Sequence, residues 1–181
     1  IFVDTPDQDM LVDGGSRGSG DVVADYLEAL NVTRIDYVVA THPHADHIGG
    51  LITVLTVYNE TQIPIVVDSG LEATSATYED YVAAVGGRTV QIAVRGEIIS
   101  LGNGVEATIL NPTSPHETDD TNDVSVVLWL QVYDVTFLLT GDIEESAEMS
   151  ILASGLGVAS TVLKVGHHGS RTSTSTEYLD E

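Results

Sequence analysis

Three histidines and one aspartate fall within six residues, in the segment at residues 42–47 that reads HPHADH. His42 and His44 alternate along the chain, so an extended backbone can direct both imidazoles at one cation. Asp46 and His47 can serve a second position beside it. Two neighbouring cations can share a bridging hydroxide, which is a nucleophile near neutral pH. A chance group of surface histidines is the alternative, but three protonated imidazoles this close would repel one another without any gain in packing.

Two further segments could supply ligands to the same site. Asp142 follows an apolar run and a glycine, so it is either a helix N-cap or a carboxylate that bridges two cations with its two oxygens. His167 and His168 also follow an apolar run. One of them could complete the second metal position, and the other could bind a substrate oxyanion or donate a proton.

The elements that must position these side chains alternate between short apolar runs and helical patterns in the first half of the chain, which indicates α/β layering. In the first expected helix, for example, Val22, Tyr26 and Leu27 recur at helical spacing behind Asp21. Strands are expected at residues 1–4, 10–12, 35–40, 63–67, 89–94, 105–110, 124–133, 135–139 and 161–165, and helices after residues 21 and 48, around 78–85 and over 143–153. The histidine cluster therefore lies between a strand and a helix.

The composition narrows the class of protein and the chemistry. With 181 residues, 43% of them hydrophobic, the chain can bury one core, and we expect a single domain over residues 1–181. Its longest apolar stretch, at residues 124–139, contains a glutamine and an aspartate, so we expect a soluble domain without a membrane span. The absence of cysteine excludes thiolate ligands and leaves imidazole and carboxylate groups for any metal.

The charge is strongly negative, with 28 acidic residues against 6 lysines and arginines and a formal net charge of -22. The acidic residues are spread between apolar segments, which is typical of a folded surface and not of a disordered tail. Adaptation to high salt, as in a halophilic organism, explains such a surface, because salt screens the self-repulsion of the chain. We then expect partial unfolding in dilute buffer. An acidic surface that binds a partner is the alternative.

The order and spacing of these motifs resemble the metallo-β-lactamase superfamily. The motifs are VDGG at residues 12–15, HPHADHIGG at 42–50, TGD at 140–142 and GHHGS at 166–170. Within that superfamily, NDVS at residues 122–125 together with LLTGD and LKVGHHGS looks like the hydrolase domain of the ComEC competence-protein family. This second similarity covers nearly the whole chain.

The resemblance implies an αββα sandwich, in which two β-sheets are flanked by helices and two divalent metal ions lie at one sheet edge. It also implies a role for each matching residue. The first metal would be held by His42 and His44, the second by Asp46, His47 and His167, and Asp142 would bridge them. Asp46 would also orient the attacking hydroxide, His168 would act in catalysis, and contacts to the ligands or the substrate would come from Asp13, Asn122, Ser125, Lys164 and Ser170.

One departure concerns the first metal. Many members of the superfamily have a third histidine where this chain has residues 122–125. The first site would then be weak, or it would be filled by Asn122, by water or by His116. Because fewer nitrogen ligands favour oxygen-preferring ions, Mn²⁺ competes with Zn²⁺ as the expected cofactor.

The resemblance also leads to expectations about the ends of the domain and the larger protein to which it belongs. Family domains generally begin with a further strand before Ile1 and end with another after Glu181, so the domain is expected to be truncated at both ends. Transmembrane helices before Ile1 would favour DNA uptake by a membrane channel protein to which the domain is attached. A free-standing secreted domain would leave the substrate open, and the sequence does not decide between an extracellular domain and one attached to a membrane protein.

The function that the resemblance implies first is hydrolysis of phosphodiesters, with DNA as the substrate, by a metal-dependent nuclease. Lys164 and Arg171 flank the GHHGS motif and could contact phosphate, but nucleic-acid binding normally depends on more positive charge than this chain carries. A second possibility keeps the metals and changes the bond to a lactone, thioester or β-lactam. A third is a noncatalytic sensor or assembly domain with a degenerate site.

Overall fold

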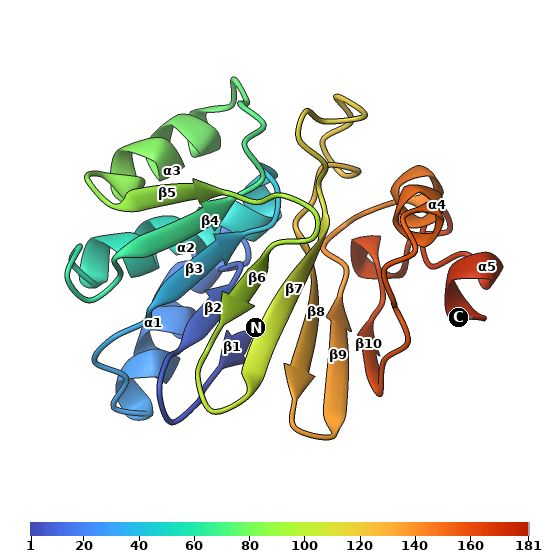
Figure 1. The fold of residues 1–181 in the computed structure, drawn as a ribbon. Coiled ribbons are helices and arrows are strands. Elements are labelled where there is room, and N and C mark those ends of the chain that lie inside the picture. Colours follow the sequence, from blue (N-terminus) through green and yellow to red (C-terminus); the bar gives the residue numbers. More distant parts are fainter. Residues whose placement is uncertain (181) are drawn as a thin grey trace. The chain divides into compact units, whose positions relative to one another are not determined.

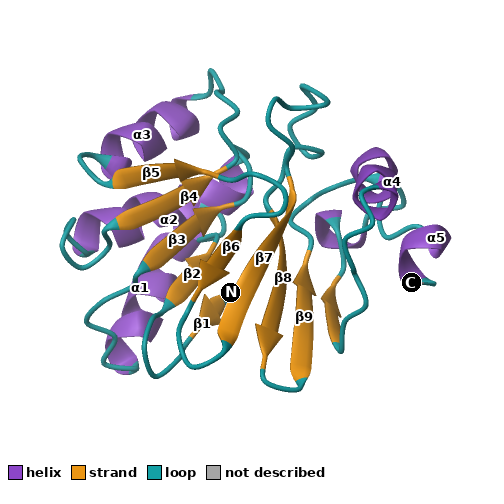
Figure 2. Cartoon of the chain, in the orientation of Figure 1, coloured by secondary structure: helices purple, strands orange, loops and turns teal. Residues whose placement is uncertain are grey.

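The computed structural model describes residues 1–180, which form two compact units. The first unit comprises residues 1–92 and the second begins at Ala93. Each unit contains one five-stranded sheet and its own helices. The strands and helices are drawn in Figures 1 and 2. The two units are described separately below.

The sheet of the first unit has the strand order β1-β2-β3-β4-β5, and only the β1–β2 pair is antiparallel. The register pairs Leu11 with Val38, and Val38 with Val66. Successive parallel strands are connected by helices, as crossover connections require. The elements are β1 (Phe2–Val3), β2 (Met10–Val12), η1 (Arg17–Ser19), α1 (Gly20–Ala29), β3 (Tyr37–Ala40), α2 (Ala45–Val57), β4 (Ile65–Asp68), α3 (Ala76–Val85) and β5 (Thr89–Ile92).

The core of the first unit forms where α1, α2 and α3 pack on one face of this sheet. Side chains alternate between the two faces along a strand, and residues paired across neighbouring strands point to the same face. Leu11, Val38 and Val66 are paired in this way, so they lie on one face of the sheet. They meet an apolar face of the helices that includes Leu27 of α1 and Leu51 of α2. The glycine-rich and apolar sequence of α2 suits this position, since the helix lies between its two neighbours.

The outer side of α1 differs from what its periodicity suggests. Val22 and Tyr26 belong to the apolar spacing of this helix, but their exposed fractions are 69% and 58%. Ala24 and Leu27 are buried instead. Because the apolar residues of α1 extend around more than one face, their spacing predicts a helix without deciding which side is buried.

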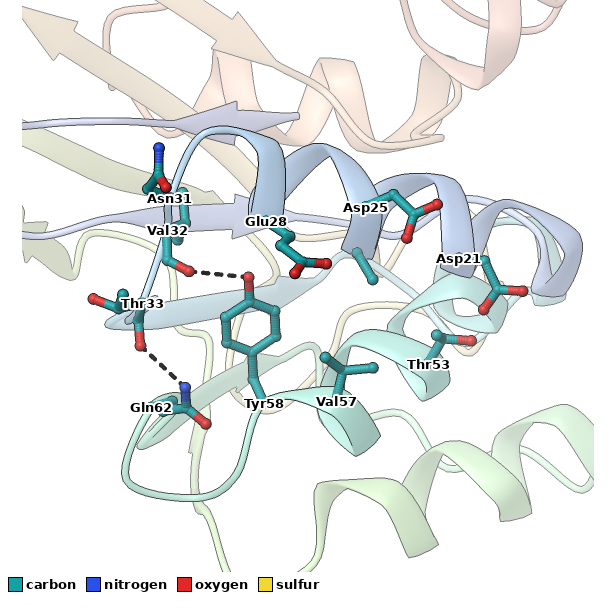
Figure 3. Close-up of a pocket in the computed structure, with 11 residues that line it drawn as sticks. Asp21, Asp25, Glu28, Asn31, Val32, Thr33, Thr53, Val57, Tyr58 and Gln62 are labelled. Atoms are coloured by element: carbon teal, nitrogen blue, oxygen red, sulfur yellow. Dashed lines mark hydrogen bonds between the residues drawn. The ribbon is translucent and has the colours of Figure 1, made fainter.

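A hollow of about 540 Å³ lies beside α1 and the end of α2 (Figure 3). Its side near Tyr58 is closed by two hydrogen bonds, from the Tyr58 hydroxyl to the carbonyl of Val32 (3.1 Å) and from Nε2 of Gln62 to the carbonyl of Thr33 (3.3 Å). Three carboxylates of α1 also line the hollow: Asp21, Asp25 and Glu28. Like charges at this helical spacing repel one another, so salt that screens them should stabilise α1.

The second sheet has the order β10-β9-β8-β7-β6, in which β9 and β10 are parallel and the other pairs are antiparallel. Helices α4 and α5 pack on one of its faces, where Leu110, Val127 and Leu138 contact Ile151 and Tyr178. The elements are β6 (Ile98–Ser100), β7 (Val105–Asn111), β8 (Val127–Val132), β9 (Val135–Leu139), α4 (Glu145–Ala153), β10 (Val162–Lys164), η2 (His167–Gly169) and α5 (Thr176–Leu179).

The buried carboxylate of Glu148 connects the two helices of the second unit. Its side chain is 1% exposed and accepts hydrogen bonds from the backbone N–H groups of Thr174 and Ser175, the latter at 2.9 Å. Ser175 in turn caps α5 by accepting from the N–H of Tyr178. A buried carboxylate needs such donors, so the start of α5 is held against α4.

The expected α/β class, with two sheets flanked by helices, is confirmed. The strands and helices predicted around the histidine segment lie within a few residues of their expected bounds. No helix within residues 1–180 combines the length and apolar character needed to cross a membrane. That residues 1–181 form a single domain stays a prediction.

Arg88 provides a test of how the first unit is stabilised. Its guanidinium is buried and donates to the carbonyls of Ala84 and Val85 at the end of α3, and to those of Leu55 and Tyr58 at the end of α2. These carbonyls have no partner within their helices. We expect Arg88→Ala to lower the free energy of unfolding by at least about 2 kcal/mol, because several buried acceptors lose a charged donor. Urea unfolding measures the change, and Arg171→Ala at an exposed position should leave stability within about 0.5 kcal/mol.

The carboxyl of Asp68 is expected to make the free energy of unfolding depend on pH. Burial raises the pKa of this carboxyl above its ordinary value of 3.8, while hydrogen bonds from the Gly70 N–H (2.7 Å) and the Tyr81 hydroxyl (2.9 Å) oppose the shift. The folded state therefore binds the proton more tightly than the unfolded state. The stability gained from protonation is present below pH 3.8 and is lost as the pH rises through the raised pKa.

We expect Asp68→Asn to remove this loss, so that its stability declines less than that of the wild type as the pH rises from about 4. Urea unfolding at several pH values and constant salt measures the difference. Asp134→Asn, at an exposed turn, is the control. Parallel pH profiles for Asp68→Asn and the wild type would contradict the role given to Asp68.

Candidate metal centre

The histidine segment of the first unit lies between the end of β3 and the first turn of α2. His42 and His47 are buried, with exposed fractions of 1% and 4%, whereas His44 and Asp46 are exposed. Nε2 of His42 lies 3.0 Å from Nδ1 of His44, and the ring centroids of His42 and His47 are 4.2 Å apart. Three imidazoles are thus gathered at the carboxyl end of a parallel strand, where layered α/β folds commonly carry their sites.

Asp13 holds this segment in place. Its carboxylate accepts hydrogen bonds from the N–H of Thr41 (2.9 Å) and from the hydroxyl of Thr41 (2.8 Å). Its Oδ2 also lies 2.7 Å from Nδ1 of His47. A proton on Nδ1 of His47 leaves the lone pair on Nε2, which lies 3.9 Å from Oδ2 of Asp46, and this is the tautomer found in metal-binding histidines.

The electrostatics at Asp13 fit this description. Burial raises the pKa of its carboxyl, but the hydrogen bond and positive charge of His47, together with the two hydrogen bonds from Thr41, outweigh burial and lower the pKa overall. Asp13 also has a φ of 55°, in the left-handed region where aspartate is tolerated better than most residues. The ionised carboxylate is therefore the form that the fold stabilises.

Two glycines allow Asp13 to approach His47. Gly14 donates its N–H to the carbonyl of His47 (2.9 Å), and the N–H of Gly50 donates to the carbonyl of Gly15 (2.8 Å). A Cβ atom at Gly50 would overlap the carbonyl oxygen of Gly14, and one at Gly14 would overlap the backbone of Leu51. Since the loop after β2 lies directly on the α2 backbone, only glycine fits at these positions.

The second unit contains its own group of candidate ligands around Asp142, which follows β9 and is 2% exposed. Its Oδ2 lies 3.1 Å from Nε2 of His168, and its N–H donates to the hydroxyl of Ser125 at 3.2 Å. Lys164 donates from Nζ to the carbonyl of Gly141 (3.0 Å), and its Nζ lies 4.0 Å from Oδ1 of Asp142. Lys164 is thus engaged beside Asp142.

His167 is directed elsewhere. Its Nδ1 lies 3.0 Å from Oε1 of Glu144, and Nδ2 of Asn122 donates to the same oxygen at 3.4 Å. Glu144 was not among the residues expected from the sequence, because its place two residues after Asp142 does not indicate a partner 23 residues further along the chain. The structure therefore separates the contacts of the two histidines, with His168 at Asp142 and His167 at Glu144.

The remaining expected residues show other surroundings. Ser125 is buried and His116 is half-buried on the loop that precedes β8, while Ser170 pairs with Thr172 through their hydroxyls at 2.9 Å. Oδ1 of Asn122 is buried and has no hydrogen-bond partner within residues 1–180.

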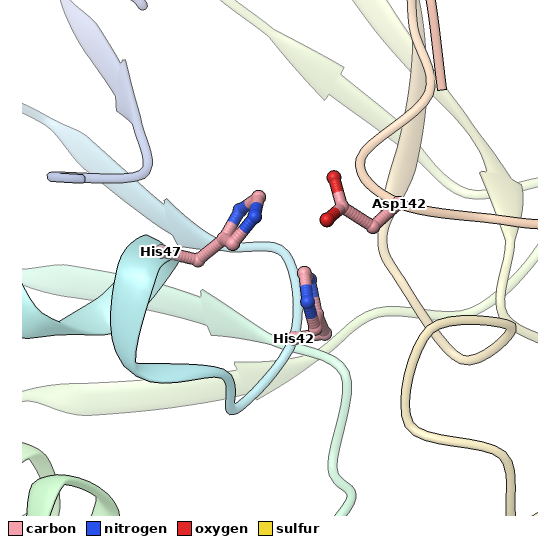
Figure 4. Close-up of side chains that lie close together, drawn as sticks. All are labelled: His42, His47 and Asp142. Carbon is pink, nitrogen blue, oxygen red and sulfur yellow. The ribbon is translucent and has the colours of Figure 1, made fainter. Parts of the chain in front are cut away.

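Imidazole and carboxylate groups of both units are candidate metal ligands, among them His42, His47 and Asp142, drawn in Figure 4. This donor set contains only nitrogen and oxygen atoms, which suits Zn²⁺ and Mn²⁺. The carboxylate on Nδ1 of His47 further supports a metal-binding role for its ring, because histidine ligands usually donate their other N–H in this way.

The sequence matches a known protein family over nearly its whole length. The family model described as the metallo-beta-lactamase superfamily matches residues 1–180. The chain belongs to the metallo-β-lactamase superfamily. Membership accounts for the two sheets flanked by helices, and the superfamily typically binds divalent metals.

Two curated relatives point to a branch of this superfamily. ComE operon protein 3 of Bacillus subtilis (strain 168) is 27% identical over 161 residues, which cover 88% of this chain and 20% of that protein. Competence protein ComA of Neisseria gonorrhoeae is 28% identical over 182 residues, covering 99% of this chain and 23% of that protein. The resemblance to ComEC-like competence proteins is thus confirmed, and the chain spans about one fifth of the length of these relatives.

A solved structure supports the fold. The MIM-2 metallo-beta-lactamase aligns with a TM-score of 0.57 and 17% identity, covering 90% of this chain and 67% of that one. At this identity the similarity shows the superfamily fold and says nothing about the substrate.

Asp13 generates a prediction for metal binding. Asp13→Asn removes the charge that holds Nδ1 of His47, so we expect divalent metal affinity to fall by about 10–100-fold while the fold is retained. Isothermal titration with Mn²⁺ and Zn²⁺ measures the affinity, and circular dichroism checks the fold. Asp7→Asn, on the exposed loop before β2, is the matched control. Equal affinities for Asp13→Asn and Asp7→Asn would show that Asp13 does not support a metal ligand.

Proposed function

We propose that this chain is a metal-dependent phosphodiesterase that acts on DNA within a ComEC-like DNA-uptake protein. The observation that carries the proposal is the buried imidazole pair of His42 and His47, with the Asp13 carboxylate 2.7 Å from Nδ1 of His47. A structural role alone does not explain why two buried imidazoles would be gathered with their ring centroids 4.2 Å apart. Membership in the metallo-β-lactamase superfamily supports the same conclusion.

In this proposal the chain binds two divalent ions through imidazole and carboxylate ligands. His42 and His44 would hold the first ion, Asp46 and His47 would hold the second, and Asp142 would serve as a ligand to both. We assign the last ligand of the second ion to His168, where the sequence had favoured His167, because Nε2 of His168 lies 3.1 Å from the carboxylate of Asp142. When bound, the ions would supply Lewis acidity and lower the pKa of a coordinated water.

His167 then takes the role that the sequence had given to His168. Its ring is partly exposed, with a side-chain exposed fraction of 30%, so a substrate can reach it. An imidazole whose Nδ1 is held by a carboxylate presents Nε2 for a hydrogen bond or proton transfer to a substrate oxygen. Lys164 is less suited to phosphate binding than expected, since its ammonium group already donates to the carbonyl of Gly141.

The choice of DNA rests on the relatives, two of which are named as ComE operon or competence proteins. The net charge of -22 opposes it, because phosphate binding normally uses many lysines and arginines. Molar salt weakens this repulsion by shortening the Debye length to about 3 Å. The same charge favours the second candidate, an uncharged lactone, thioester or β-lactam substrate, whose binding does not require a basic surface.

Activity assays separate these candidates. We expect the protein, loaded with Mn²⁺ or Zn²⁺ in molar salt, to hydrolyse bis(p-nitrophenyl) phosphate and single-stranded DNA, and to leave nitrocefin, a lactone and a thioester intact. His47→Ala and Asp142→Asn should each reduce the rate by more than about 100-fold, beyond the usual effect of residues that only contact a ligand. Asp134→Asn is the control.

The other outcomes are equally informative. Hydrolysis of the carbonyl substrates alone would establish the second candidate. Failure to hydrolyse any substrate, together with no metal uptake by the folded protein, would make the chain a noncatalytic sensor or assembly domain.

A further inference from the structure

Glu144 lies two residues after Asp142, at the N-cap position of α4, but its side chain does not cap that helix. Its Oε1 instead lies 3.0 Å from Nδ1 of His167 and accepts from Nδ2 of Asn122 at 3.4 Å. A single carboxylate oxygen thus connects the NDVS, TGDIE and GHHGS segments of the second unit.

The backbone of Glu144 is fixed on both sides. Its N–H donates to Oδ1 of the buried Asp123 at 2.7 Å, and its carbonyl accepts from the N–H of Glu148 at 3.1 Å. Asp123 therefore takes the place near the helix N-terminus that the Glu144 carboxylate would otherwise occupy. This leaves the carboxylate of Glu144 available to His167.

The backbone of the GHHGS segment directs its two imidazoles apart. His167, His168 and Gly169 have φ values of 43°, 53° and 80°, so three successive residues are left-handed. For residues with a Cβ this backbone conformation is strained and requires compensating contacts. The contacts are a hydrogen bond from the His167 N–H to the carbonyl of Gly141 (3.3 Å) and those of the two rings. The ring centroids lie 6.1 Å apart with planes inclined by 62°.

We propose that Glu144 is a positioning residue that orients the imidazole of His167 toward substrate. Glu144 accepts the hydrogen bond of Nδ1–H, which fixes the ring plane and directs Nε2 to a hydrogen bond with a substrate oxygen. Asn122 holds the carboxylate in this orientation, a role different from that of a metal ligand. The inference rests on the proposed function for its catalytic consequence, but the pairing itself does not depend on which bond is hydrolysed.

The arrangement repeats in the second unit the chemistry of Asp13 and His47 in the first. In both, a carboxylate oxygen lies within 3.0 Å of the Nδ1 atom of a histidine. The difference is exposure, since His47 is buried whereas the side chain of His167 is 30% exposed. The two pairs therefore share the contact between a carboxylate and Nδ1 and differ in how far solvent and substrate can reach the ring.

The pairing is tested first by NMR of the folded protein in molar salt. Long-range ¹H–¹⁵N spectra at pH about 8.5, well above the ordinary histidine pKa of about 6.5, report which ring nitrogen carries the proton. We expect His167 to carry it on Nδ1 in the wild type and in Glu145→Gln, and to shift toward the Nε2–H form in Glu144→Ala. Glu145 is an exposed neighbour on α4 and matches the change in charge. An Nε2–H tautomer in the wild type, or one unaffected by Glu144→Ala, overturns the proposal.

Kinetics on bis(p-nitrophenyl) phosphate test the consequence. We expect Glu144→Ala to lower kcat by about 10–100-fold with little change in KM and unchanged metal content. Glu144→Gln keeps an acceptor oxygen and should recover part of the loss, and Glu145→Gln should match the wild type. Equal rates for Glu144→Ala and Glu145→Gln would overturn the positioning role. If the wild type hydrolyses no phosphodiester, the proposed function fails, while the NMR result still decides the pairing of Glu144 with His167.

Discussion

The carboxylate of Asp13 takes hydrogen bonds from the backbone and hydroxyl of Thr41 and lies against Nδ1 of His47. A carboxylate in this environment is stable in its charged form only while these donors are in place. The contact also requires the close approach of Gly14 and Gly50. The loop after β2, the loop after β3 and the first turn of α2 are therefore held in one arrangement, and the orientation of the buried histidines follows from it.

In the second unit, imidazoles are also oriented by carboxylates, but the carboxylates come from other segments. His168 contacts Asp142 and His167 contacts Glu144, so adjacent residues acquire separate functions. This depends on the left-handed backbone at both histidines. Such conformations persist where surrounding contacts determine them, and they are concentrated at functional sites. The GHHGS segment fits that description because each ring is held by a carboxylate from another part of the unit.

The strongly acidic composition is compatible with a folded core because buried and exposed carboxylates have different surroundings. Those that are buried have donors: Glu148 accepts from two backbone N–H groups, and Asp123 accepts from the N–H of Glu144. Exposed carboxylates such as Asp21 and Asp25 instead line a surface hollow, where they repel one another. The structure thus places the destabilising charge where salt can screen it.

The sequence by itself determined the α/β class and the candidate ligands near residue 44, because apolar periodicity and close histidine spacing are local properties. It did not determine which of His167 and His168 lies at Asp142, because the direction of each ring depends on left-handed backbone angles that residue types do not specify. It also did not indicate Glu144, whose partner lies 23 residues further along the chain. Only the tertiary structure decided these contacts, since they form between segments whose proximity no local pattern encodes.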